Sequence, residues 1–223
     1  MNSAEPQPVT IPVNDAQRVS GLLQAPREAR ACCVLAHGAG AGMTHPFMTA
    51  IAKGLAERGI ATLRYQFPYM EQGSKRPDAP KLAQATVRAA VLEASRLPLA
   101  LFAGGKSFGG RMTSQAQAKQ PLDGVRGLAF FGFPLHPAGK PSTDRADHLT
   151  EVHVPMLFLQ GSNDKLAEPN LLKPVAEKLK PRATLHLVEA ADHSFHVPVR
   201  SGRNDREVMT ETLDALAAWL GTI

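Results

Sequence analysis

The length of 223 residues allows one well-buried hydrophobic core and is short for two, so we expect a single domain over residues 1–223. The net charge of +5 comes from basic residues interspersed with acidic ones, which argues against a nucleic-acid-binding protein with a concentrated basic stripe. The polar residues 1–8 lack a signal-peptide pattern and no apolar stretch has the length of a membrane span, so we expect a cytoplasmic protein without a membrane partner.

The first elements predict the edge and the start of a β-sheet. Residues 9–13 and 18–23 flank a turn-rich interval, which indicates an antiparallel hairpin at a sheet edge. Residues 31–36 form a continuous apolar run, typical of a strand covered on both faces. Cys32 and Cys33 lie in this run, where a bond between neighbours would strain the backbone. We expect reduced core thiols, consistent with a cytoplasmic protein.

Apolar helical spacing and short apolar runs alternate along the rest of the chain. We expect further strands at residues 60–65, 99–102, 125–131, 156–160 and 183–188, with helices at residues 47–58, 82–97, 107–120, 172–179 and 209–220. This alternation predicts an α/β fold with a mostly parallel sheet of about eight strands, an antiparallel N-terminal edge and helices on both faces. The proline-broken interval 132–154 is too short for a large cap domain.

A glycine-rich string follows the predicted strand at residues 99–102. Gly105-x-Ser107-x-Gly109 fits a nucleophile elbow, in which a strand turns sharply into a helix and exposes a serine hydroxyl. The overlapping string Gly105-Lys106-Ser107 is also the end of a phosphate-binding loop. That loop requires a glycine where this chain has Ala100, which weakens the nucleotide-binding interpretation without removing it.

An acid and a histidine complete the pattern, each just beyond a predicted strand. Ser107, Asp164 and His193 occur in the order serine, acid, histidine, as in the α/β-hydrolase fold. His193 would accept the serine proton, and Asp164 would hold the imidazole in the right tautomer. The oxyanion of the reaction requires two backbone N–H donors, for which we predict Phe108 and Ala39. His37 precedes Ala39 and is expected to hold this loop.

Together these motifs resemble those of a family of small α/β hydrolases related to dienelactone hydrolases and to the testis-expressed and NSL-complex-subunit proteins of eukaryotes. The resemblance extends roughly from Ala31 to the C-terminal helix. It is carried by His37-Gly-Ala-Gly, His45-Pro-Phe47, Tyr65-Gln-Phe-Pro-Tyr69, Gly104-Gly-Lys-Ser-Phe-Gly-Gly-Arg111, Gln160-Gly-Ser-Asn-Asp164 and Asp192-His-Ser-Phe195. It implies the fold and a serine-hydrolase triad, but no substrate. Dienelactone hydrolases use a cysteine nucleophile, so their lactone chemistry is not implied for this serine.

Two groups of side chains are candidates for contacts with the substrate. A set of cations could favour an anionic substrate, although solvent-exposed charge is the simpler interpretation: Lys75, Arg76, Lys106, Arg111 and His136. A set of aromatic side chains could form an apolar acyl pocket, or could equally pack in the core: Phe67, Tyr69, Phe133 and Phe195. Without a cap, a small or protruding substrate is expected.

The sequence therefore predicts a serine hydrolase that cleaves a small carboxylic ester or thioester through an acyl-enzyme on Ser107. No cofactor and no metal is expected, since the histidines lack ligand-like spacing. The chain is expected to be a monomer or a homodimer. A catalytically weak hydrolase-fold protein that serves in binding or as a scaffold is the main alternative, and nucleotide binding at Lys106 is a third.

Overall fold

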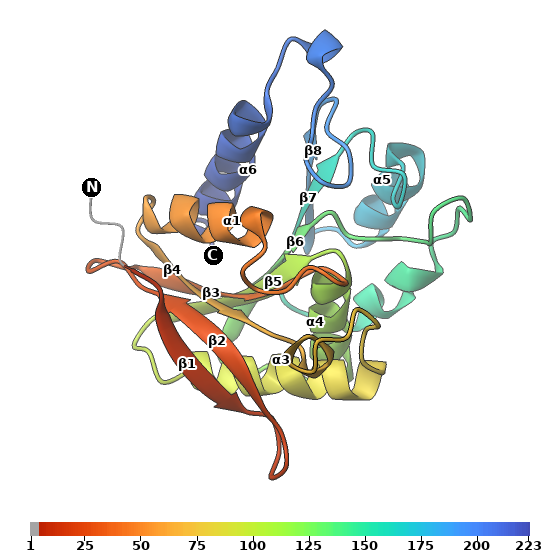
Figure 1. Ribbon diagram of the computed structural model, residues 1–223. Helices are drawn as coiled ribbons and strands as arrows, with labels where there is room; N and C mark the ends of the chain where they lie inside the picture. Colours follow the sequence, from red (N-terminus) through yellow and green to blue (C-terminus); the bar gives the residue numbers. More distant parts are fainter. Residues whose placement is uncertain (1–4) are drawn as a thin grey trace.

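A single mixed sheet forms the centre of the structure, a computed structural model that describes residues 5–223 (Figure 1). Its eight strands in this part of the chain have the spatial order β1-β2-β4-β3-β5-β6-β7-β8. The strands are β1 (Gln7–Pro12), β2 (Arg18–Gln24), β3 (Ala31–Ala36), β4 (Ile60–Tyr65), β5 (Ala100–Lys106), β6 (Val125–Phe131), β7 (Met156–Gly161) and β8 (Ala183–Val188).

The N-terminal hairpin forms one edge of the sheet, as the sequence predicts. β1 pairs antiparallel with β2, and β2 pairs antiparallel with β4, whereas the pairs from β4 through β3 to β8 are all parallel. The Asn14 side chain closes the hairpin because its Oδ1 accepts hydrogen bonds from the backbone N–H groups of Ala16 and Gln17 at 3.0 and 2.9 Å. The parallel strands therefore present their carboxyl ends at one common edge.

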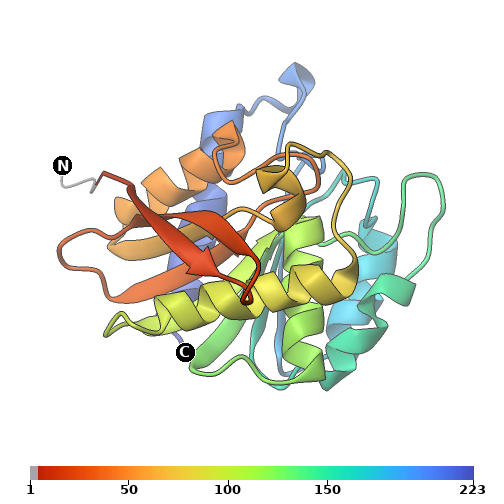
Figure 2. The same cartoon turned by 60° about the horizontal axis from the view of Figure 1, so that its bottom comes forward.

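Helices cover both faces of the sheet, as expected. α1 (Pro46–Ala56) and α6 (Asp205–Leu220) pack on one face, while α3 (Pro80–Ala94), α4 (Phe108–Lys119) and α5 (Pro169–Lys178) cover the other. Figure 2 shows α3 crossing in front of α4 on the second face, where the two helices are in contact. The helix starts follow local rules, since α1, α3 and α5 begin with proline at the first turn and α6 begins with a capping box of Asn204 and Glu207.

The buried strand β3 shows why its two cysteines stay apart. Successive residues of a strand point to opposite faces, so Cys32 packs toward α3 and α4 while Cys33 packs toward α1 and α6. Both thiols are free and buried, and burial raises the pKa of Cys32 to about 12. These cysteines are core residues, as predicted.

The loops contain structure that the sequence pattern does not indicate. β5 continues to Lys106, four residues beyond the predicted strand, and a short helix α2 (Pro68–Glu71) interrupts the expected loop at residues 66–80. The proline-broken interval contains a 3₁₀ helix, η1 (Asp144–Glu151), which packs against α4 and adds no cap domain. A second, η2 (Val199–Ser201), precedes α6. Among residues 5–223, no helix combines the length and apolarity needed to cross a membrane.

Candidate active site

Ser107 occupies a strained turn between β5 and α4. Its φ of 51° and ψ of −115° lie outside the favoured regions for a non-glycine residue, a strain that costs about 1–3 kcal/mol. Gly105 and Gly109 flank Ser107 because the backbone of this turn comes very close to the backbone at the end of β3. A Cβ at Gly105 would lie 2.2 Å from the Ala36 carbonyl oxygen, and one at Gly109 would lie 2.5 Å from the His37 carbonyl oxygen. The geometry is that of a nucleophile elbow.

The loops after β7 and β8 bring Asp164 and His193 to Ser107. His193 Nε2 lies 2.9 Å from Ser107 Oγ, and His193 Nδ1 lies 2.7 Å from Asp164 Oδ2. The Asp164 side chain is fully buried, whereas 26% of the His193 side chain is exposed. An ionised carboxylate can only accept hydrogen bonds, so Nδ1 carries the proton and Nε2 is left to accept the hydroxyl proton of Ser107. The three residues therefore form one hydrogen-bonded chain in the order predicted.

Gln160, a residue without a predicted role, holds Asp164 in place. Its Nε2 donates to Asp164 Oδ2 at 2.5 Å, and its Oε1 accepts from the backbone N–H of Phe133 at 2.8 Å. The other carboxylate oxygen accepts from the backbone N–H of Leu166 at 2.8 Å. Gln160 is fully buried. An amide side chain that ends an otherwise apolar strand four residues before the acid is the signal by which the sequence could have revealed this role.

The loop after β3 lies beside the serine and is held by His37. This histidine is fully buried, its Nε2 accepts from the Phe67 backbone N–H at 3.1 Å, and its Nδ1 donates to the Gly38 carbonyl at 2.7 Å. Burial lowers the pKa of His37 to about 4, so the imidazole is neutral at physiological pH. As expected, His37 holds the loop on which Ala39 lies.

Ala39 and Phe108, the two predicted oxyanion donors, both lie beside Ser107, the first in the lining of the same hollow and the second as the next residue of the chain. Phe108 is the first residue of α4, where the N–H has no acceptor within the helix. Ala39 lines the same hollow as Ser107. The position next to the serine and the position on the loop after β3 are those at which this fold provides its oxyanion donors.

A hollow of about 260 Å³ opens at Ser107. Phe47 and Met48, from the first turn of α1, supply its apolar wall, and neither is among the residues that we predicted for substrate contact. The full lining is Gly38, Ala39, Ala41, His45, Phe47, Met48, Lys106, Ser107, His193 and Ser194. The hollow is thus formed by the elbow, the histidine loop, the loop after β3 and the start of α1.

The aromatic side chains predicted to form an acyl pocket lie in the core instead. Phe67, Tyr69 and Phe195 are 0%, 2% and 3% exposed, and Phe133 is fully buried. The ring of Phe67 packs against Phe108, with centroids 5.4 Å apart. Packing in the core, the alternative interpretation of these four side chains, is what the structure shows, and Phe47 of α1 lines the hollow. The backbone N–H of Phe67, just before α2, donates to His37 and so helps to hold the loop after β3.

Of the five predicted cations, Lys106 alone lines the hollow. Lys75 and Arg76 are exposed on the loop after α2, whereas His136 is buried with its Nε2 2.7 Å from Glu168 Oε2. Arg111 lies one turn into α4, partly buried. The expected cluster of substrate-facing cations is therefore reduced to Lys106.

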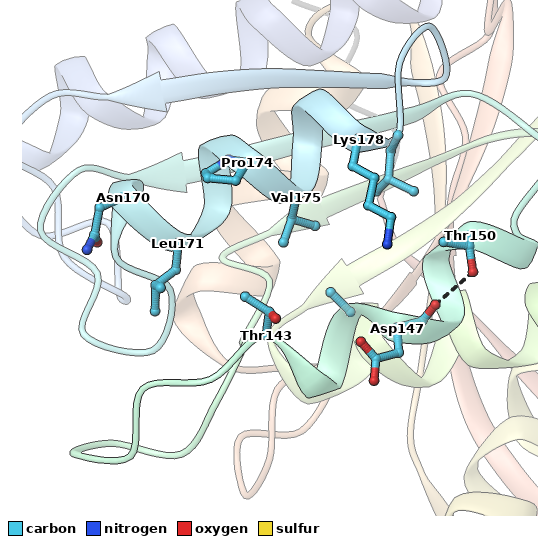
Figure 3. Close-up of a pocket in the computed structure, with 10 residues that line it drawn as sticks. Thr143, Asp147, Thr150, Asn170, Leu171, Pro174, Val175 and Lys178 are labelled. Atoms are coloured by element: carbon cyan, nitrogen blue, oxygen red, sulfur yellow. Dashed lines mark hydrogen bonds between the residues drawn. The ribbon is translucent and has the colours of Figure 1, made fainter.

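A second hollow, of about 490 Å³, lies between η1 and α5 (Figure 3). Its walls consist of aliphatic side chains together with Asp147, Asn170, Lys178, Thr143 and Thr150. Among the described residues that line it, none is a serine, a histidine or a cysteine, and Ser107, Asp164 and His193 all lie outside it. The smaller hollow at Ser107 is the candidate active site.

Comparison with solved structures shows the same fold in other proteins. Dienelactone hydrolase from Anabaena variabilis ATCC 29413 is 21% identical, the match covers 98% of each chain, and the TM-score is 0.76. An α/β serine hydrolase without a lid from Xanthomonas campestris is 19% identical over 96% of this chain and 95% of that chain, with a TM-score of 0.73. An α/β serine hydrolase homologue from Coxiella burnetii is 20% identical over 97% and 99%, also with a TM-score of 0.73. At these identities the similarity establishes the fold.

A protein-family model gives the family itself. The model, described as an alpha/beta hydrolase domain, matches residues 29–221, which include the elbow, the acid and the histidine. The chain therefore belongs to the alpha/beta hydrolase family, and its class of enzyme is hydrolase.

Proposed function

We propose that the protein cleaves a small carboxylic ester or thioester through an acyl-enzyme on Ser107. The observation that carries this proposal is the hydrogen-bonded chain from Asp164 through His193 to Ser107, which ends at the wall of the hollow. A serine hydroxyl is a poor nucleophile near neutral pH, and this chain supplies the base that it needs.

In the first half of the reaction, Ser107 Oγ attacks the acyl carbon while His193 Nε2 takes the hydroxyl proton. The positive charge that develops on the imidazole lies beside the buried carboxylate of Asp164. The carbonyl oxygen becomes an oxyanion, for which the N–H groups of Ala39 and Phe108 are the proposed donors. The bond from carbon to the leaving oxygen or sulfur then breaks, and His193 gives its proton to the leaving group.

In the second half, water attacks the carbonyl carbon of the acyl-enzyme and gives a proton to His193. The bond between the acyl carbon and Ser107 Oγ breaks, and His193 returns the proton to the serine oxygen. The acid leaves and the starting state is restored. Every proton moves through His193 Nε2, which is why this atom must remain unprotonated before attack.

The size of the hollow supports a small acyl substrate. About 260 Å³ is below the range of about 300–1,000 Å³ typical of sites that enclose a drug-sized ligand. The site also lacks a cap domain, like the serine hydrolase without a lid that shares the fold. We therefore propose that one end of the substrate enters the hollow and that the remainder protrudes.

The two alternatives have less support. Nucleotide binding would require Lys106 to reach a phosphate, but its Nζ donates to the His193 carbonyl oxygen at 2.6 Å. A binding or scaffold protein would not need strain at the nucleophile, a buried acid and a histidine joined to both. The complete chain of hydrogen bonds favours an enzyme.

Covalent labelling with a fluorophosphonate, together with hydrolysis of p-nitrophenyl acetate, tests the proposal. Wild-type protein is expected to be labelled, and Ser107→Ala and His193→Ala are expected to lose labelling and turnover. Asp164→Asn is expected to lower kcat by about 10⁴-fold, because the wrong tautomer faces the serine. Ser194→Ala is the matched control, since Ser194 lines the same hollow and is expected to leave labelling intact. Labelling that persists in Ser107→Ala, or a wild type that neither labels nor cleaves esters, would contradict the proposal.

A further inference from the structure

We propose that Lys106 is a positioning residue that holds the backbone of the histidine loop, so that His193 meets Ser107; this inference rests on the serine-hydrolase function proposed above. Lys106 is the last residue of β5 and directly precedes the nucleophile. Its Nζ donates a hydrogen bond of 2.6 Å to the backbone carbonyl oxygen of His193. The Lys106 side chain thus connects the end of β5, directly before Ser107, to the backbone of His193.

The surroundings of the ammonium group fit this role. The Nζ atom lies 5.8 Å from the ring centroid of Phe47 and 5.7 Å from that of Phe195, within the range of cation–π attraction. Gly132 provides the remaining space, since a Cβ there would lie 2.9 Å from Nζ and 3.3 Å from His193 Nδ1. With a φ of +67°, Gly132 also has a conformation that favours glycine. Residues of α1, the histidine loop and the loop after β6 thus meet at one ammonium group.

The charge of Lys106 strengthens its hydrogen bond to the His193 carbonyl oxygen. The titratable groups that face it are Asp164, on the loop after β7, and Asp192 and His193, on the histidine loop. Among residues 5–223, no carboxylate lies within ion-pair distance of Nζ, so the carbonyl oxygen is its direct partner. A hydrogen bond from a charged donor is roughly twice as strong as one between neutral groups.

The same charge predicts a dependence on pH. Burial lowers the pKa of Lys106 to about 8, against the opposing effect of the two carboxylates. Below that pH the ammonium holds the loop. Above it the neutral amine loses the charge assistance and the attraction to both rings, so the rate is expected to fall on the alkaline side. We expect kcat to change and not KM, because Nζ is hydrogen-bonded to the protein and not to the substrate.

The test combines Lys106→Met with a control at an exposed lysine of a neighbouring loop, Lys75→Met. Methionine keeps the unbranched shape and removes both the donor and the charge. We expect kcat for p-nitrophenyl acetate to fall about 10- to 100-fold with KM within about threefold of wild type, as for a misplaced catalytic group. The alkaline fall of the wild-type profile near pH 8 should vanish in Lys106→Met and persist in Lys75→Met.

Chemical rescue separates positioning from damage to the fold. Lys106→Cys followed by alkylation with 2-bromoethylamine restores an amine at the same distance, with a lower pKa because of the neighbouring sulfur. We expect kcat to recover and the alkaline fall to move to lower pH. Cys32 and Cys33 are 0% and 1% exposed, so the folded wild type treated in the same way controls for their alkylation.

The outcomes distinguish this inference from the function on which it rests. If the wild type is not labelled by fluorophosphonate, the proposed function itself fails. If the wild type is active but Lys106→Met keeps kcat within twofold, or if alkylation of Lys106→Cys restores nothing, the positioning role is wrong. If Lys106→Met instead raises KM for carboxylate-bearing esters and leaves kcat unchanged, Lys106 binds the substrate, and this result also overturns the proposal.

Discussion

His37 should make the stability of the protein depend on pH in a window that the structure defines. The imidazole is fully buried, and burial lowers its pKa from the ordinary 6.5 to about 4. In the unfolded chain the same histidine takes up a proton near pH 6.5. Between these two pKa values the unfolded state binds more protons than the folded state, so the free energy of unfolding falls as the pH is lowered.

The expected loss is about 1.4 kcal/mol per pH unit inside this window. Lowering the pH from about 6.5 to about 5 should therefore remove about 2 kcal/mol, and the complete window down to about pH 4 about 3 kcal/mol. The stabilisation is fully present above the pKa of the unfolded state. Protonation would also remove the acceptor for the Phe67 N–H, and with it the hold on the loop that bears Ala39.

Urea unfolding of the wild type and of His37→Gln, measured over this pH range, isolates the contribution. A glutamine oxygen can accept from the Phe67 N–H in place of Nε2 but does not titrate. His148 also has a lowered pKa, through burial and the Arg111 charge, but it titrates in both proteins and cancels in the difference. The free energy of unfolding of the wild type relative to the variant should fall by about 2 kcal/mol from pH 6.5 to pH 5.

One result would refute the reasoning about His37. If the difference in free energy of unfolding between wild type and His37→Gln stays constant across this range, His37 does not remain neutral in the folded state. Burial would then not lower the pKa of this imidazole, whatever constant difference in stability the substitution introduces.

Two further predictions concern packing. Gly104→Ala should lower the free energy of unfolding by at least about 3 kcal/mol, because its Cβ would lie 1.8 Å from the Ala129 carbonyl oxygen. Gly73→Ala has no atom within 4 Å of the new Cβ and should cost only the strain of its positive φ, about 1–2 kcal/mol. Urea unfolding measures both, and equal losses would contradict the steric argument. Phe67→Leu should lower stability by about 1 kcal/mol or more and leave kcat/KM for p-nitrophenyl acetate within about threefold, because the ring packs in the core. If Phe67→Leu instead raises KM with kcat unchanged, Phe67 contacts the substrate.

The fold and the meeting of Ser107, Asp164 and His193 at one edge of the sheet could be predicted from the sequence for a definite reason. Buried parallel strands appear as short apolar runs, and the residues after each run must lie at the common carboxyl edge of the sheet. Ser107, Asp164 and His193 each follow such a run in chain order, and Gly105 and Gly109 mark the close approach of backbones at the elbow. These are local features, which need no knowledge of how loops pack.

The tertiary structure decided which loop side chains enter the hollow and which support it. Phe67 and Phe195 face the core while Phe47 lines the site, although nothing in their local sequence distinguishes them. Gln160 accepts from the Phe133 N–H, and Lys106 donates to the His193 carbonyl, only because segments from distant parts of the chain meet there. The physical reason is that periodicity reports burial within helices and strands, whereas a loop has no period, and the direction of its side chains depends on the packing of the whole fold.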